Sequence, residues 1–209
     1  MRLLSIDTSS NLLSVALAEN YVLVASESRY MERGQGEALI PIIQTLCQKA
    51  QWDITSLNQV ISAIGPGSFT GVRIALATAR GIGLALNIPA YGMTNFDSLT
   101  MPDMPYPLCV ALDTKRGDCY TQIFESYNKT QSPQIRSLSD IIALNLPVLT
   151  DNITLFDHFD IRLIDKPFNP AANMIHSAKL KPSVLKSPDP LYLREADVTL
   201  SVACVPHVG

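Results

Sequence analysis

Two aspartates follow apolar runs that have the composition of β-strands. Asp7 comes after LLSI and Asp113 after CVAL, and each precedes a threonine and a polar turn. Two carboxylates at such strand ends could hold Mg²⁺ across a cleft, and they could equally cap the turns. We favour the turn role, because Ser9, Ser10 and Asn11 form a polar turn without the glycine that a phosphate loop favours.

A glycine-rich loop, GPGSFTGV, begins at Gly65 and leads into a helical pattern. Free backbone N–H groups and the helix dipole attract anions at such a position. The loop lacks the lysine of GxxxxGK[ST], and Thr70 stands where GxGxxG requires its third glycine. We therefore favour a tight turn capped by Ser68 or Thr70. The weak candidates for anion or nucleotide contact are Asp7, Ser9, Gly67, Ser68 and Asp113.

No other motif for metal binding or nucleophilic catalysis stands out. His158, His176 and His207 are too far apart in the sequence to form a local metal motif, and there is no GxSxG elbow. The cysteines are widely scattered without a CxxC pair, so we expect reduced thiols. They are Cys47, Cys109, Cys119 and Cys204.

The elements that must position the first aspartate and the glycine loop follow a βββαβα order. Apolar runs and helical spacing predict strands over 2–6, 12–18, 21–29 and 60–64, and helices over 37–51 and 70–86.

The chain contains an internal similarity. SIDTSSNLLSVAL and ALDTKRGDCYTQIF both consist of a strand, Asp-Thr, a polar turn and a second strand, and their aspartates are 106 residues apart (113 − 7). Chance similarity is the alternative, but the spacing of half a chain favours duplication. We predict an α/β fold of two related lobes, 1–97 and 107–209, joined by a proline-containing linker over 95–107.

The second copy is less regular than the first. We expect its strands at 107–113, 119–125, 147–150 and 161–164, and a helix at 171–180.

The predicted helix 70–86 has apolar residues all round, and alanines and glycines between positions 75 and 85 make it thin. Such a helix is buried on most sides and allows close approach of a neighbour. Arg73 and Arg80 lie seven residues apart on one face and require acidic partners. Those partners could be carboxylates of this chain, a bound anion or an acidic strip on another protein.

Composition limits the possible functions. The 209 residues are 47% hydrophobic and 17% charged, with a formal net charge of −3, so the chain should fold and lacks an overall positive field for RNA. Asp7 interrupts the first apolar run too early for a signal peptide, and no run reaches membrane-spanning length. We expect a cytoplasmic protein that does not associate with a membrane and meets nucleic acid only within a complex.

Five segments together resemble the bacterial TsaB family, also called YeaZ. They are LSIDTSS, GEALIP, GPGSFTGVRIALATARGIGLAL, DTKRGDCY and PLYLRE, in this order. The resemblance covers the first hundred residues well and the second half in patches. It implies two actin-like (ASKHA, RNase H-like) lobes, of which the second is shortened here.

The resemblance also implies a function. A TsaB protein is the non-catalytic scaffold that binds and activates the homologous enzyme TsaD, which forms N6-threonylcarbamoyladenosine (t6A) at position 37 of tRNAs reading ANN codons. The ATPase TsaE joins the assembly. No cofactor is expected to bind this chain tightly, and ATP and Mg²⁺ are expected only at the level of the complex.

Two departures from the family pattern matter. Catalytic relatives have a metal-ligating HxxxH pair where Asn95 and Leu99 stand here, and leucine cannot ligate a metal. Many members have His-Ser or His-Thr in place of Gln35-Gly36, which affects the contacts at the start of the first helix.

Family members dock onto TsaD through the two helices of the first lobe, and without TsaD the same surface should support a homodimer. The candidate docking residues are Leu39, Ile42, Ile43, Leu46, Arg73, Ile74, Leu76, Ala77, Arg80, Gly81 and Leu84. The competing hypotheses are an ATP-binding or ATP-hydrolysing enzyme that uses Asp7 and Asp113, a peptidase-like protein, and a binder of small ligands without turnover.

Overall fold

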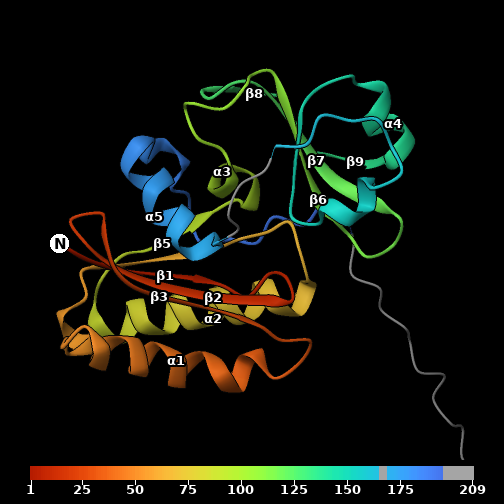
Figure 1. The fold of residues 1–209 in the computed structure, drawn as a ribbon. Helices are drawn as coiled ribbons and strands as arrows, with labels where there is room; N and C mark the ends of the chain where they lie inside the picture. Colours follow the sequence, from red (N-terminus) through yellow and green to blue (C-terminus); the bar gives the residue numbers. More distant parts are fainter. Residues whose placement is uncertain (165–168, 195–209) are drawn as a thin grey trace, which may run out of the picture.

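The computed structural model describes residues 1–164 and 169–194, and they form two β-sheets with helices on their faces (Figure 1). The first sheet has the order β3-β2-β1-β4-β5, in which β1, β2 and β3 are antiparallel neighbours and β4 and β5 run parallel to β1. Its strands are β1 (Arg2–Asp7), β2 (Leu12–Glu19), β3 (Val22–Tyr30), β4 (Gln59–Ala63) and β5 (Ala90–Met93).

Helices cover both faces of the first sheet. Helices α1 (Gln35–Lys49) and α2 (Phe69–Leu86) lie side by side on one face, and α5 (Pro170–Leu180) lies on the other (Figure 1). Successive side chains of a strand point to opposite faces. Leu4 therefore packs into the core under α1 and α2, whereas Leu3 packs against α5.

The second sheet has the order β10-β6-β7-β8, with β9 also paired to β7. The strands are β6 (Leu108–Asp113), β7 (Asp118–Ser126), β8 (Lys129–Thr130), β9 (Gln134–Ser137) and β10 (Val148–Thr150). Shorter helical segments are α3 (Asn95–Leu99), α4 (Leu138–Ala143), η1 (Ile54–Ser56), η2 (Ile153–Phe156) and η3 (Pro182–Val184).

The two sheets repeat one arrangement. Strand β1 is antiparallel to β2 and parallel to β4, just as β6 is antiparallel to β7 and parallel to β10. Asp7 and Asp113 are both the last residues of the first strand in these pairs. The predicted α/β fold of two duplicated lobes, with a smaller second sheet region, is confirmed.

Two predictions about connections need correction, and one strand was missed. The predicted linker contains α3, whose Phe96 and Leu99 lie in the core of the second lobe, and β5 was not predicted at all. The helix at 171–180 exists, but it packs on the first sheet through Met174 and Ile175. The sequence places this helix in the second lobe because it follows the second-lobe strands. In the structure its apolar face packs on the side of the first sheet that α1 and α2 leave uncovered. The division at 97 and 107 stays a prediction.

Helix α2 is the longest helix among the described residues. Ser68 caps its start by accepting a hydrogen bond from the Gly71 amide at 3.3 Å, and Asn87 ends it in a left-handed conformation with φ of 53°. Its 18 residues have a mean hydropathy of 1.3, so by length and composition it could cross a membrane, unlike our expectation. Core helices pass the same test, and the inner side of α2 packs on the sheet through Ala75 and Ala79.

Two glycines of α2 predict opposite effects of the same substitution. A Cβ at Gly71 would lie 1.8 Å from the carbonyl oxygen of Thr8, whereas a Cβ at Gly81 has nothing within 4 Å. Gly71→Ala should therefore lower the free energy of unfolding by about 2–3 kcal/mol or prevent folding, because α2 must move away from the β1–β2 turn. Gly81→Ala should raise it by about 1 kcal/mol through helix propensity. Urea unfolding followed by circular dichroism measures both, and equal effects would contradict the close contact at Gly71.

Candidate functional site: the inter-lobe cleft and the outer face of α2

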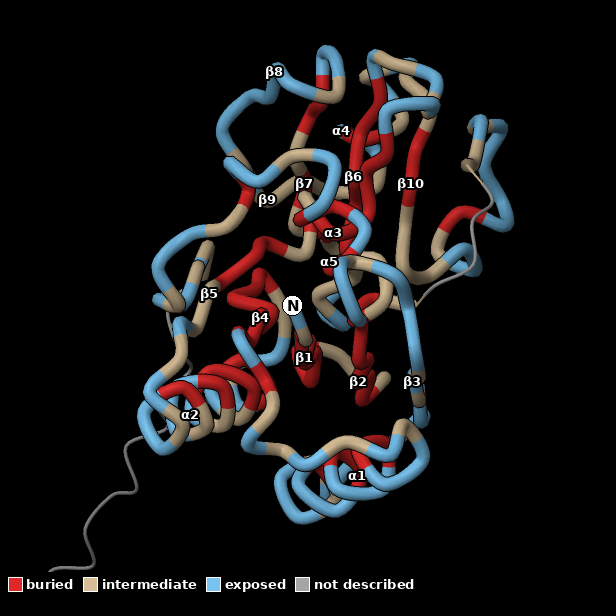
Figure 2. Tube along the Cα trace, turned by 90° about the vertical axis from the view of Figure 1, so that its left-hand side faces the viewer, coloured by how far each residue is buried: buried red, intermediate tan, exposed pale blue. Residues whose placement is uncertain are grey.

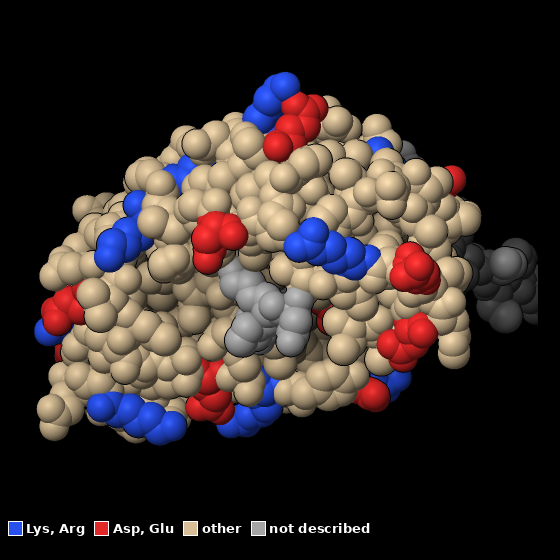
Figure 3. Space-filling view, turned by 45° about the horizontal axis from the view of Figure 1, so that its top comes forward, with Lys and Arg blue, Asp and Glu red and all other residues tan. Residues whose placement is uncertain are grey.

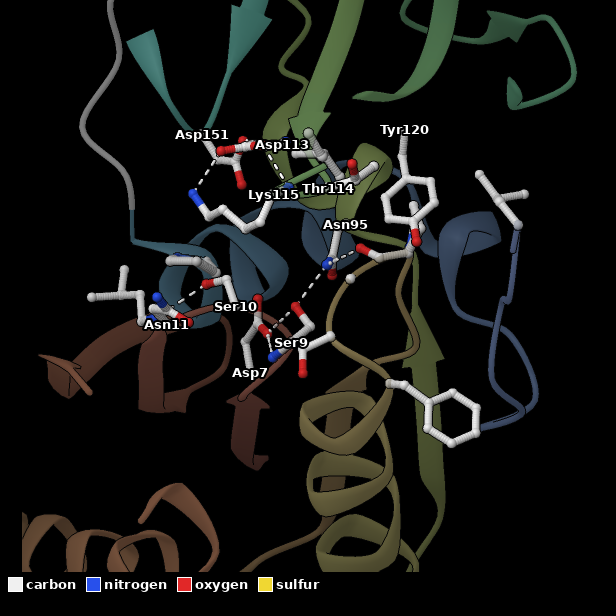
Figure 4. A pocket seen from close by; sticks show the side chains of 18 of the residues that line it. Asp7, Ser9, Ser10, Asn11, Asn95, Asp113, Thr114, Lys115, Tyr120 and Asp151 are labelled. Carbon is white, nitrogen blue, oxygen red and sulfur yellow. Dashed lines mark hydrogen bonds and ion pairs between the residues drawn. The ribbon is translucent and has the colours of Figure 1, made fainter. Parts of the chain in front are cut away.

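A cavity of about 630 Å³ lies between the two lobes. Its walls are the β1–β2 turn, the glycine loop before α2, the start of α3 and the β6–β7 turn, so both halves of the repeat contribute to it (Figure 4). Asp7 and Ser9 enter from the first lobe, and Asp113, Lys115 and Asp151 enter from the second.

The glycine loop packs directly against the β1–β2 turn. The Ser68 amide donates to the Ser9 carbonyl oxygen at 2.6 Å, and a Cβ at Gly67 would lie 2.4 Å from that same oxygen. The Ser9 amide and hydroxyl both donate to Asp7 Oδ1, at 2.7 and 2.6 Å. The structure thus brings four predicted anion contacts together, but the amides of Ser9 and Ser68 already have partners within the chain.

The carboxyl groups of the cleft differ in their surroundings. Burial raises the pKa of Asp7, against the effect of the two Ser9 hydrogen bonds. Burial acts in the same direction on Asp113, but hydrogen bonds from Lys115 Nζ at 2.6 Å and Asn152 Nδ2 at 2.9 Å outweigh it and hold the pKa of Asp113 below its ordinary value. The Lys115 ammonium therefore lies beside Asp113 on the side that faces the cleft (Figure 4).

The positions that would hold the HxxxH pair have other roles here. Asn95 Nδ2 donates to Ser9 Oγ at 2.7 Å and to the Pro66 carbonyl oxygen at 2.8 Å, which ties α3 to the glycine loop. Leu99 is 3% exposed and belongs to the second-lobe core. Within residues 1–164 and 169–194, no three His, Cys, Asp or Glu side chains form a group that could hold a metal ion.

The thiols described by the structure are not placed for catalysis. Cys47, Cys109 and Cys119 are buried and unpaired, as predicted. Burial raises the pKa of Cys109 to about 11 and that of Cys119 to about 12, so both stay protonated near neutral pH. Of the histidines, His158 and His176 are exposed on different elements. Cys204, His207 and the last residue of PLYLRE lie outside the described residues.

The structure corrects the predicted docking surface. Five candidates are core residues, because helical periodicity identifies an apolar stripe but not which neighbour covers it. They are Leu39, Ile42, Ile43 and Leu46 in α1 and Leu76 in α2, all at most 3% exposed.

Most of the remaining candidates are exposed, and the exposed side of α2 points away from the sheet, whereas Ile74 packs partly against the core (Figure 2). Leu84 is 86% exposed, Ala77 and Gly81 are exposed beside it, and Ile74 is half-buried. In α1, Ile40 is 44% exposed and was not predicted; it lies about 100° around the helix from Leu39, at the edge of the buried stripe. We call Ile40, Ile74, Ala77, Gly81 and Leu84 the outer face.

Arg73 and Arg80 contact the C-terminal part of the described chain. Arg80 forms an ion pair with Asp189 at 2.8 Å, so one of the internal acidic partners considered from the sequence exists. Arg73 has an aromatic environment instead. Its guanidinium lies 3.6 Å from the centre of the Phe69 ring, and its Nε donates to the Tyr192 hydroxyl at 3.1 Å.

Comparison with solved structures identifies the fold. YeaZ from Pseudomonas aeruginosa superposes with a TM-score of 0.74 at 20% identity, over 92% of this chain and 99% of that one. Component A of (R)-2-hydroxyglutaryl-CoA dehydratase from Acidaminococcus fermentans gives 0.52 at 8% identity, over 85% and 96%. Two duplicated lobes around a cleft and these similarities identify an actin-like fold.

Sequence comparison gives the family. A model described as TsaD, tRNA N6-adenosine threonylcarbamoyltransferase, matches residues 29–169, which is more than half of the chain. The tRNA threonylcarbamoyladenosine biosynthesis protein TsaB of Bacillus subtilis is 27% identical over 61% of this chain and 57% of its own length. That of Escherichia coli is 30% identical over 57% and 53%. The chain spans little more than half the length of these relatives. It belongs to the TsaB (YeaZ) family.

The half-buried Asp151 predicts a pH dependence of stability. Burial raises the pKa of Asp151 to about 6, even though the Asp113 amide donates to its Oδ1 at 2.9 Å. Between about pH 4 and 6 the folded chain holds this proton and the unfolded chain releases it, so the stability from this group is lost as pH rises through that window. Asp151→Asn keeps the acceptor and cannot titrate.

The unfolding free energy of Asp151→Asn relative to wild type should therefore increase by about 1–2 kcal/mol from pH 4 to pH 7. Urea denaturation at several pH values measures this difference. Parallel pH profiles for the two proteins would show that Asp151 titrates normally in the folded state.

Proposed function

We propose that this chain is a non-catalytic scaffold subunit that binds and activates a TsaD-type enzyme in forming t6A at position 37 of tRNAs reading ANN codons. The names of the TsaB relatives support a place in this process, and the matching family model supports a link to TsaD. The replacement of the HxxxH pair by Asn95 and Leu99 supports a role without metal catalysis.

The observation that carries the proposal is the outer face. Leu84 presents an apolar side chain to solvent at 86% exposure, next to positions where alanine and glycine leave the helix surface flat. A flat small-residue surface lets the backbone of another helix approach closely, and a projecting leucine can fill a hole in that helix. We propose that two helices of the TsaD-type subunit pack here against α1 and α2.

Further partners belong to the same proposal. A TsaE-type ATPase joins the assembly in the cytoplasm, and the outer face supports a homodimer when the TsaD-type subunit is absent. In this proposal tRNA binds to the assembled complex and not to this chain alone. On the face seen in Figure 3, basic side chains are interspersed with acidic ones, which favours neither a phosphate backbone nor a tight single-chain RNA complex.

We propose that ATP and Mg²⁺ act only at the level of the complex. Two local contacts support this. The amides of Ser9 and Ser68 are bonded within the chain and are not available to a phosphate, and the Lys115 ammonium neutralises Asp113 where a metal ion would approach. A nucleotide bound to this chain alone would have to replace these bonds.

Substitution of Leu84 tests the docking surface. Leu84→Lys should weaken binding to the TsaD-type subunit at least about tenfold, because a charge would be buried at the centre of the contact. The fold should be unaffected, since this side chain is exposed and a lysine near a helix C-terminus is tolerated. Binding is measured by calorimetry with the purified subunit.

Ile153→Lys is the matched control, because Ile153 is 57% exposed in η2 of the second lobe. Wild-type affinity in Leu84→Lys, or equal losses in both variants, would contradict docking through the outer face.

ATP turnover tests the competing hypothesis of an actin-like enzyme. The purified chain alone should hydrolyse ATP no faster than Asp7→Asn, in which the asparagine can still accept from Ser9. Phosphate release is measured at saturating Mg²⁺. Turnover that is present in the wild type and lost in Asp7→Asn would establish an enzyme and contradict the scaffold proposal.

A further inference from the structure

Residues 186–194 cross from the first lobe to the second, and we call them the strap (Figure 1). At its start the Lys186 amide donates to the Gly92 carbonyl oxygen and the Gly92 amide donates to that of Lys186, both at 2.9 Å. Since β5 is an edge strand, this pairing adds the strap to the first sheet. Further along, the Leu191 amide donates to the Ile64 carbonyl oxygen at 2.7 Å.

The middle of the strap lies against α2. Leu191 packs onto Ile64, Val72 and Leu76, and these three residues form a small core of their own. Leu76 is therefore buried by the strap and not by a partner protein.

Two arginines of α2 form hydrogen bonds with the middle of the strap. Arg80 donates to the Pro188 carbonyl oxygen and to Asp189, at 2.5 and 2.8 Å, and Arg73 donates to Tyr192. The Tyr192 ring also lies 5.0 Å from that of Phe69. All these groups come from the first lobe or from the strap.

The end of the strap contacts the second lobe. Arg194 forms an ion pair with Asp118 at 2.5 Å, and Leu193 packs against the second-lobe core. Asp118 in turn accepts hydrogen bonds from Thr114, so this contact reaches the β6–β7 turn. Strap residues 191–194 also line the inter-lobe cavity.

We propose that the strap is a latch that couples α2 to the β6–β7 turn and fixes the opening of the cleft. A displacement of α2 pulls on Leu191 and Tyr192, and the neighbouring Leu193 and Arg194 transmit it to Asp118. A molecule bound on α2 next to Arg73 and Arg80 thereby changes the cleft without entering it. The latch does not depend on the identity of that molecule.

Hydrogen exchange of single amides tests the coupling in the chain alone. Leu191→Ala removes the half-buried anchor on the first-lobe side and leaves all second-lobe residues in place. It should speed exchange of the Gly92 and Lys186 amides about tenfold. Through the latch it should also speed exchange of the Thr114 amide by about threefold or more. This amide lies in the second lobe and donates to the Asp118 carbonyl oxygen.

Ile54→Ala is the matched control for lost packing. Ile54 is a half-buried aliphatic residue of the first lobe that packs on the core of α1 and lies far from the strap in sequence. It should leave the exchange of Thr114 unchanged. Faster exchange of Thr114 in both variants would indicate general destabilisation and would overturn the proposal.

A second pair of variants examines the α2 side. Arg80→Ala should speed exchange of Lys186 and Thr114 about twofold to threefold, because its ion pair is exposed and contributes little by itself. Arg29→Ala breaks a similar exposed pair with Glu27 on β3 and should change neither amide. If Leu191→Ala and Arg80→Ala affect only the amides of the strap and β5, the strap is a local covering and the latch proposal is wrong.

Discussion

The close packing of the glycine loop on the β1–β2 turn is the contact on which the site depends. A Cβ at Gly67 or Gly71 would collide with the carbonyl oxygens of Ser9 and Thr8, so two glycines allow α2 to start directly at the end of β1. The Ser68 amide and the Thr8 hydroxyl fasten this contact with hydrogen bonds. It fixes the direction of α2 and, through that direction, which residues form the outer face.

The same contact also determines which backbone donors of the cleft already have partners within the chain. In an actin-like arrangement the loops at the strand ends face each other across the cavity, and the free amides of such loops could bind anions. Here the Ser68 amide joins the glycine loop to the β1–β2 turn, the Ser9 amide is bonded to Asp7 within that turn, and the Lys115 ammonium lies beside Asp113. The cleft between the two lobes is thus retained, while several of its backbone donors stabilise the fold.

The strap and α5 connect the lobes more extensively than a simple duplication requires. Helix α5 follows the second-lobe strands in the chain but covers the first sheet, and the strap then runs beside β5 and α2 before it reaches Asp118. The first lobe therefore packs against α5, which follows the second-lobe strands. The second lobe contacts the end of the strap, which follows α5. The outward side of α2 and the cleft between the lobes are consequently linked by the strap.

The sequence by itself determined most elements of the first lobe, the duplication and the family. Strands and helices of the first lobe have strong periodicity, and the two Asp-Thr turns mark equivalent hairpins because a strand end followed by a polar turn is a local feature. The motif that begins at Gly65 is also a local run of residues, so it indicated the family without any coordinates. The identity of residues at Asn95 and Leu99 excluded the metal pair without any coordinates.

Only the tertiary structure decided which side of each helix faces outward and which distant segments meet. Leu39 and Ile40 are neighbours with similar side chains, yet one is in the core and the other is 44% exposed, and periodicity cannot say which neighbour covers a helix that is apolar all round. The burial of Leu76 depends on Leu191, 115 residues later (191 − 76). Contacts of this kind come from the packing of whole lobes, which a local pattern does not contain.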